Sequence, residues 1–176
     1  MEKHIDAKRR LNFISGEDFY FFTYELLILL DILTADSGKF KDHRKLSYLV
    51  PLVADESAIS ILERYAGRKI ANADDKERLF STFASGELHR REIYKLLFAL
   101  QKRGFLKLEK SSTAEVLDIT LLREALPEGF LLNVAFVRDR QNAVAIKKQF
   151  SRLTVLTLDG FLDKIYTQYG VQVWAR

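Results

Sequence analysis

A helical pattern that passes directly into a hairpin pattern, between Gly86 and Thr120, constrains the fold of this chain most strongly. Apolar residues first recur at the spacing that lines one face of a helix, and a glycine then ends that helix. These residues are Ile93, Leu96, Leu97, Leu100 and Gly104. Two apolar runs, 105–108 and 116–119, then flank a serine- and threonine-rich turn at 111–113. The pattern predicts a helix followed at once by two antiparallel strands.

A second helix is expected before this one. The pattern predicts a helix over 74–84 with Asp74 as its N-cap, a tight turn at Ser85-Gly86, and then the helix over 88–103. Two helices joined by a tight turn and followed by a hairpin form a winged-helix arrangement. We therefore expect an α+β, mostly α-helical fold that contains a winged-helix-like module over 73–120.

The apolar segment from Phe19 to Leu33 predicts a long helix over 17–35. Its apolar residues run nearly all round the helix, so it lies either inside the chain's own core or under another chain. It holds Glu25 and Asp31 and is shorter than the ~20 residues that a bilayer requires, so we expect no membrane partner. Our candidate protein-interface residues are Phe19, Phe22, Leu26, Leu30 and Trp174.

The chain divides into four stretches that we expect to pack as one unit. They are a polar arm (1–14), an N-terminal helical region (15–72), the winged-helix-like module (73–120) and a C-terminal helical region (121–176). Pro51 is expected to divide or kink the apolar run 46–53. Further helices are expected over 56–65, over 143–150 and from a Thr157 cap to Gly170. The closing residues 171–174 predict a short strand or an anchoring tail.

Positive charge concentrates in the block that holds the predicted helix and hairpin. Between Gly86 and Lys110, seven bases face three acids, a surplus equal to the net charge of +4 of the whole chain. The bases are Arg90, Arg91, Lys95, Lys102, Arg103, Lys107 and Lys110. Such a stripe is typical of a surface that binds phosphates with release of counterions, and it also suits a solvated helix face or an acidic protein partner.

Residues that could carry out catalysis are sparse. The absence of cysteine removes disulfides and thiolate metal sites and is typical of a cytoplasmic protein. The three histidines, His4, His43 and His89, stand in no metal-ligand spacing, and no glycine-rich phosphate loop is present. The charged N-terminus lacks the apolar core of a secretory leader. We therefore predict no catalytic residue, no metal and no cofactor, and do not expect a metal-dependent nuclease.

Three segments within about Tyr24 to Trp174 carry a family resemblance. They read LLDILTADSGKFKDHRKLSYL, REIYKLLFALQKRGFLKLEK and RLTVLTLDGFLDKIYTQYGVQVW. Together they resemble the middle component of bacterial ABC-three-component systems, which include the small accessory subunit of Lamassu-type anti-phage defence. The resemblance rests on patterns of apolar and charged residues and includes no catalytic signature.

This resemblance implies a non-catalytic subunit that bridges an SMC-like or Rad50-like ABC ATPase and an effector, often a nuclease. It also implies that the subunit helps keep the effector inactive until DNA is sensed, with DNA contact mainly through the complex. The basic stripe alone favours a different function, that of a free-standing winged-helix regulator of double-stranded DNA. Stoichiometry, the effector's identity and the surface that meets the ATPase stay open.

Overall fold

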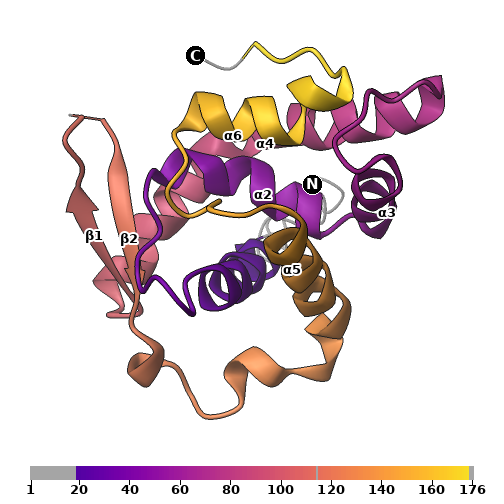
Figure 1. The fold of residues 1–176 in the computed structure, drawn as a ribbon. Helices are drawn as coiled ribbons and strands as arrows, with labels where there is room; N and C mark the ends of the chain where they lie inside the picture. Colours follow the sequence, from indigo (N-terminus) through magenta and orange to yellow (C-terminus); the bar gives the residue numbers. More distant parts are fainter. Residues whose placement is uncertain (1–18, 114, 175–176) are drawn as a thin grey trace, which may run out of the picture.

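The computed structural model describes residues 19–113 and 115–174 and has a mostly helical α+β fold with one hairpin (Figure 1). The hairpin lies at one end of the molecule and α3 at the other. Short 3-10 helices are labelled η. The elements are a first helix over 19–33, η1 (His43–Lys45), α2 (Leu46–Val53), α3 (Glu56–Tyr65), α4 (Ala73–Lys102), β1 (Leu106–Lys110), β2 (Leu117–Leu121), η2 (Arg123–Ala125), η3 (Phe130–Leu132), η4 (Val134–Phe136), α5 (Val137–Gln149), α6 (Leu158–Ile165) and η5 (Thr167–Tyr169).

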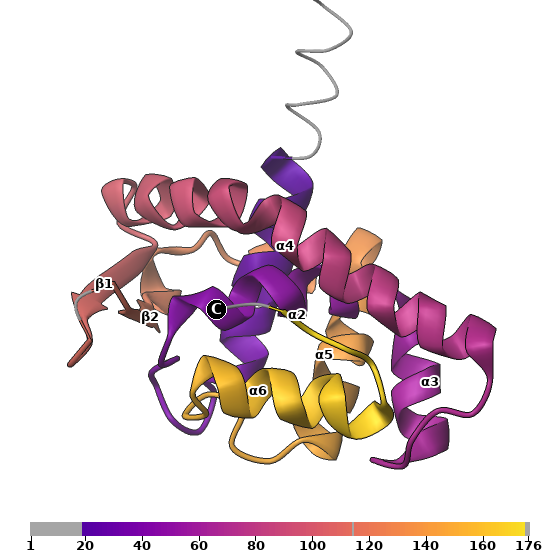
Figure 2. The ribbon, with the colours of Figure 1, turned by 90° about the horizontal axis from the view of Figure 1, so that it is seen from above.

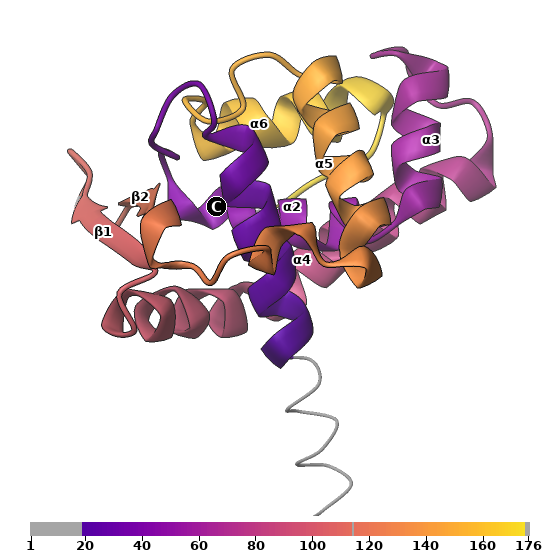
Figure 3. The ribbon, with the colours of Figure 1, turned by 90° about the horizontal axis from the view of Figure 1, so that it is seen from below.

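Within its described residues, the first helix is buried from Leu26 onward and exposed from Phe19 to Phe21. Every side chain from Leu26 to Leu30 is at most 1% exposed, so the chain's own fold covers this part. Leu26 and Leu30 are therefore wrong as interface residues, because they offer no area to another chain. The other end of the helix extends past α4 (Figures 2 and 3). The predicted arm at 1–14 lies outside the described residues.

A single helix, α4, spans the region where the sequence predicted two helices and a turn. Asn72 caps it in place of the expected Asp74, since the Asn72 Oδ1 atom accepts hydrogen bonds from the backbone N–H groups of Asp74 and Asp75 at 2.9 and 3.0 Å. The expected turn at Ser85-Gly86 is wrong, because the helix continues through both residues. The helix–turn–helix half of the predicted module is thus not formed within this segment.

Gly86 serves the packing of α4 against α2. A Cβ atom at this position would lie 2.6 Å from Cδ1 of Tyr48 and 3.0 Å from the backbone oxygen of Ser47. Only glycine permits so close an approach of two helix backbones.

Pro51 does not divide α2, which runs through it to Val53. In a helix, the N–H group of residue 51 would donate to the backbone oxygen of residue 47. Proline has no N–H group, so the Ser47 oxygen, which faces Gly86, receives no such hydrogen bond.

The predicted hairpin is confirmed. β1 and β2 pair as antiparallel strands, and Phe40 adds an isolated bridge to Ile119 with backbone hydrogen bonds of 2.8 Å in both directions. The Gln101 side chain in the last turn of α4 accepts a hydrogen bond from the backbone N–H of Leu108 at 2.7 Å. This contact fixes the hairpin against the helix, while the winged-helix assignment as a whole stays a prediction.

The C-terminal region matches the sequence in part. α3 begins and ends as predicted, and the Thr157 hydroxyl caps α6 by accepting from the N–H of Gly160 at 3.2 Å. α5 begins at Val137, earlier than the predicted 143. Residues 171–174 form a tail and no strand, and the Trp174 ring packs edge-on to Phe83 of α4 at 4.9 Å. No helix within the described ranges combines the length and the apolar content needed to cross a bilayer.

Candidate functional site

The candidate site is a groove of about 920 Å³ between α4, the start of α2 and the connection between the two strands. Three of the seven predicted bases, Arg90, Arg91 and Lys95, line it. The other lining residues are His43, Arg44, Ser47, Glu87, Leu88, Ile93, Tyr94 and Glu115. Lys102 and Arg103 lie at the end of α4, and Lys107 and Lys110 lie on β1, so the structure distributes the predicted stripe over one helix and one strand.

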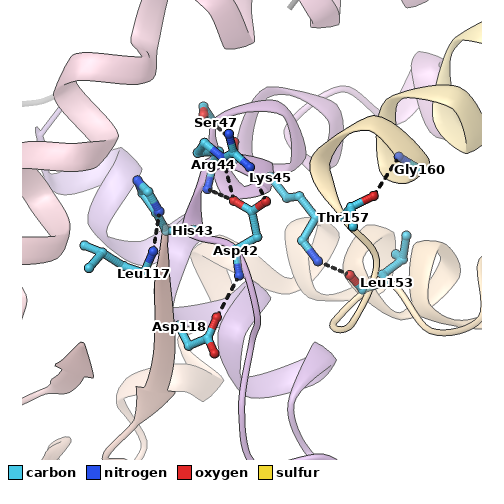
Figure 4. Close-up of polar contacts among 10 residues, drawn as sticks. All are labelled: Asp42, His43, Arg44, Lys45, Ser47, Leu117, Asp118, Leu153, Thr157 and Gly160. Atoms are coloured by element: carbon cyan, nitrogen blue, oxygen red, sulfur yellow. Dashed lines mark hydrogen bonds and ion pairs between the residues drawn. The ribbon is translucent and has the colours of Figure 1, made fainter. Parts of the chain in front are cut away.

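A polar cluster at the start of α2 builds one wall of the groove (Figure 4). Asp42 adopts a left-handed backbone conformation with φ of 62°, and its carboxylate accepts two hydrogen bonds from the Arg44 guanidinium, at 2.8 and 2.7 Å, and one from the Arg44 backbone N–H at 3.2 Å. The backbone N–H of Asp42 donates to Asp118 of β2 at 3.1 Å. His43 Nδ1 accepts from the N–H of Leu117 at 3.1 Å. These bonds fix the wall to the hairpin.

The charge states of this cluster follow from burial and pairing. Burial alone would raise the pKa of Asp42, but hydrogen bonds and charge from Arg44 outweigh it and the pKa is lowered. Burial lowers the pKa of His43, so this imidazole stays neutral at pH 7 and can accept the bond from Leu117. The wall therefore presents Arg44 as its cation, already shared with Asp42.

Lys45 belongs to the interior although it sits beside the groove. Its side chain is fully buried, its Nζ donates to the backbone oxygen of Leu153 at 2.6 Å, and the same atom lies 4.7 Å from the centre of the Phe40 ring. Burial lowers the pKa of Lys45 to about 8. This cation is therefore unavailable to a ligand in the groove (Figure 4).

Ion pairs involve two of the seven predicted bases. Arg90 pairs with Glu87 at 3.4 Å and Lys107 pairs with Glu109 at 3.2 Å. Within residues 19–113 and 115–174, the other five bases make no ion pair, and all five are exposed. These five are Arg91, Lys95, Lys102, Arg103 and Lys110.

Two exposed aromatic residues between these bases were missed at the level of sequence. Tyr94 and Phe98 on α4 are 45% and 42% exposed, and their rings meet edge to face with centres 5.0 Å apart. The Tyr94 ring also lies 5.5 Å from the His43 ring. The sequence could have revealed this pair. Tyr94 and Phe98 are four residues apart, so they are neighbours on the surface of a helix, and Lys95 stands between them in the sequence.

The remaining candidate interface residues lie at the surface in different ways. Phe19 and Trp174 are exposed, while Phe22 is half-buried against His89 of α4 with ring centres 4.8 Å apart. Tyr20 and Phe21, which we did not select, are also exposed. The exposed group formed by Phe19, Tyr20 and Phe21, the first described residues of this helix, is called the aromatic end below.

One buried carboxyl group lies outside the groove. Neither side-chain oxygen of Glu25 has a hydrogen-bond partner in the described part of the chain, and the side chain is fully buried. Burial, with the nearby charge of Asp139, raises the pKa of Glu25 to about 9, so the group is protonated at pH 7. In the described part of the chain, no three His, Asp or Glu side chains gather closely enough to hold a metal ion.

Comparisons of the chain with protein-family models, with curated protein sequences and with solved structures find no match.

Proposed function

We propose that the chain is a non-catalytic accessory subunit that bridges an SMC-like or Rad50-like ABC ATPase and an effector, often a nuclease, in a bacterial anti-phage or anti-plasmid defence complex. In this proposal the subunit helps hold the effector inactive until DNA is sensed. The observation that supports a bridging role is the aromatic end, in which Tyr20 is 68% exposed. The identity of the partners comes from the sequence resemblance alone.

The aromatic end has the properties of an interface anchor. Within the described residues it extends beyond α4, where its side chains are exposed (Figures 2 and 3). The continuation of the same helix from Leu26 onward is fixed in the core, so the backbone that carries the aromatic end is anchored before binding. Rigid aromatic side chains contribute strongly to protein interfaces because they bury large area at little entropic cost.

Co-expression with the products of the neighbouring genes tests the proposal. The tagged chain should co-purify with an ATPase and an effector, and the double variant Phe19→Asp with Tyr20→Asp should reduce recovery of at least one partner by about tenfold or more. Leu132→Asp is the matched control, since Leu132 is 70% exposed on η3. A chain that ignores both neighbours, or a double variant that binds them as well as the control does, would contradict the proposal.

A second candidate function is that of a free-standing winged-helix regulator of double-stranded DNA. What supports it is a helix followed by a hairpin, with cations on both elements that form no ion pair with any described residue. The isolated protein should then bind duplex DNA with a strong dependence on salt, and Arg90→Ala with Arg91→Ala should flatten that dependence. Absence of duplex binding at low salt would exclude this candidate.

A further inference from the structure

We infer that the exposed face of α4 binds single-stranded nucleic acid along a cation–aromatic stripe. The stripe consists of Arg91, Tyr94, Lys95, Phe98 and Lys102, all of them exposed. It covers about 16 Å of helix at 1.5 Å per residue. This surface is distinct from the aromatic end, so the inference and the bridging role can each fail alone.

The stripe lies on the side of α4 that the core does not use. The core-facing positions of the same helical segment are Ile93, Leu96, Leu97 and Leu100, each at most 2% exposed. Tyr94 and Phe98 stand between these positions in the sequence, but more than 40% of each side chain faces solvent. The fold therefore does not bury these two rings, although each could have contributed to the core.

The two rings are oriented before any ligand arrives. The Tyr94 ring meets the Phe98 ring edge to face, and its centre lies 5.5 Å from the centre of the His43 ring. His43 is itself fixed, because its Nδ1 accepts the hydrogen bond from Leu117 of β2. A ring that is already held loses little conformational entropy when a base stacks on it.

The cations of the stripe are available to phosphates. Arg91, Lys95 and Lys102 alternate with the rings and make no ion pair within the described part of the chain. Glu87, one of the two carboxylates that line the groove, accepts hydrogen bonds from both Tyr48 and Arg90. Alternating cations and aromatic rings match a strand whose phosphates alternate with bases.

Exposed rings favour a single strand over a duplex. In a duplex each base is covered on both faces by its neighbours, so a protein meets only base edges and phosphates. Phe98 has no polar atom for either contact. An unpaired base presents its face, and stacking on an aromatic ring contributes about 1–3 kcal/mol per base. An acidic peptide could match the charge of the stripe, but its carboxylate side chains have no aromatic face to stack on the two rings.

Fluorescence anisotropy on the intact chain tests this inference. The probes are a fluorescein-labelled oligothymidine of about 20 nucleotides and a duplex of equal length, titrated between about 50 and 200 mM salt. The wild-type chain should bind the single strand about tenfold more tightly than the duplex, and Tyr94→Ala with Phe98→Ala should weaken single-strand binding by about tenfold or more. Arg91→Ala with Lys95→Ala should reduce the salt slope by about 1.4.

The matched control is Arg138→Ala with Lys148→Ala, which removes two exposed cations from α5 and should change neither affinity nor slope. Far-ultraviolet circular dichroism of each variant checks that the fold is retained. Equal affinity for both probes together with an unaffected Tyr94/Phe98 variant would overturn the inference in favour of duplex recognition. Absence of binding to either probe at about 50 mM salt would overturn it in favour of an acidic protein partner.

Discussion

The inner and outer faces of α4 differ in what determines their residues. On the inner face, Gly86 lets the backbone of α2 approach closely, and the apolar residues beyond it enter the core. On the outer face, two aromatic rings and three cations meet solvent. Packing explains why the inner positions hold glycine and apolar residues. It does not explain why two large aromatic rings stand at the surface. Substitutions on the inner face should therefore act on stability, and those on the outer face should act on binding.

Among substitutions on the two faces of α4, the largest effect is expected at the inner face, from Gly86→Ala. In a solvent-exposed helix this change would stabilise by about 1 kcal/mol. Here the new Cβ atom would meet the Tyr48 ring at 2.6 Å and the Ser47 backbone oxygen at 3.0 Å, and a backbone atom cannot move away freely. We expect the free energy of unfolding in urea to fall by about 3 kcal/mol.

Ser85→Ala is the control for this prediction, because it changes the preceding residue of the same helix without adding an atom. Its free energy of unfolding should stay within about 0.5 kcal/mol of the wild type. If Gly86→Ala proves more stable than the wild type, α2 and α4 do not cross as closely as described.

A pH-dependent effect is expected from the buried carboxyl group of Glu25. Its pKa is raised in the folded protein from 4.5 to about 9, so the folded state binds one more proton than the unfolded state between these values. The stabilising contribution is fully present below about pH 4.5 and is lost as pH rises toward 9, by up to about 1.4 kcal/mol per pH unit. Urea unfolding of the wild type and of Glu25→Gln at several pH values measures this slope.

Glu25→Gln cannot ionise, so its stability should decline less steeply over the same pH range. Arg91→Ala, which alters the outer face, should keep the wild-type slope. Identical slopes for Glu25→Gln and the wild type would mean that Glu25 is not the group that titrates.

The smallest effect on stability is expected at the outer face. Arg91→Ala and Lys95→Ala remove exposed side chains without an ion pair among the described residues, so each should change the free energy of unfolding by less than about 0.5 kcal/mol. Thermal unfolding followed by circular dichroism measures this. A clearly lower melting temperature in either variant would mean that the outer face is part of the folding core.

Local patterns account for the parts of the fold that the sequence predicted. The hairpin, α3 and the Thr157 cap each depend on residues close together in the chain. Gly86 was misread as a turn because a glycine between two helical patterns is typical of a break, and the α2 crossing that requires it involves residues far away in sequence. Asn72 and Asp74 are both good caps, so the helix start was ambiguous.

The candidate site was predictable only in part. Its cations follow from composition, but the loss of Arg90 and Lys107 to ion pairs depends on side-chain geometry. An apolar pattern all round a helix cannot tell which protein covers it, which is why Leu26 was wrongly assigned to an interface. Tyr94 and Phe98 could have been found from their spacing beside Lys95.

Ultraviolet cross-linking of the intact chain to an oligothymidine, followed by mass spectrometry of the modified peptides, tests the central claim most directly. If the outer face of α4 is a binding surface for single strands, the cross-links should fall at Tyr94 and Phe98 and should disappear when both are changed to alanine. Cross-links confined to α5 or to the aromatic end, with none on residues 91–102, would contradict the account.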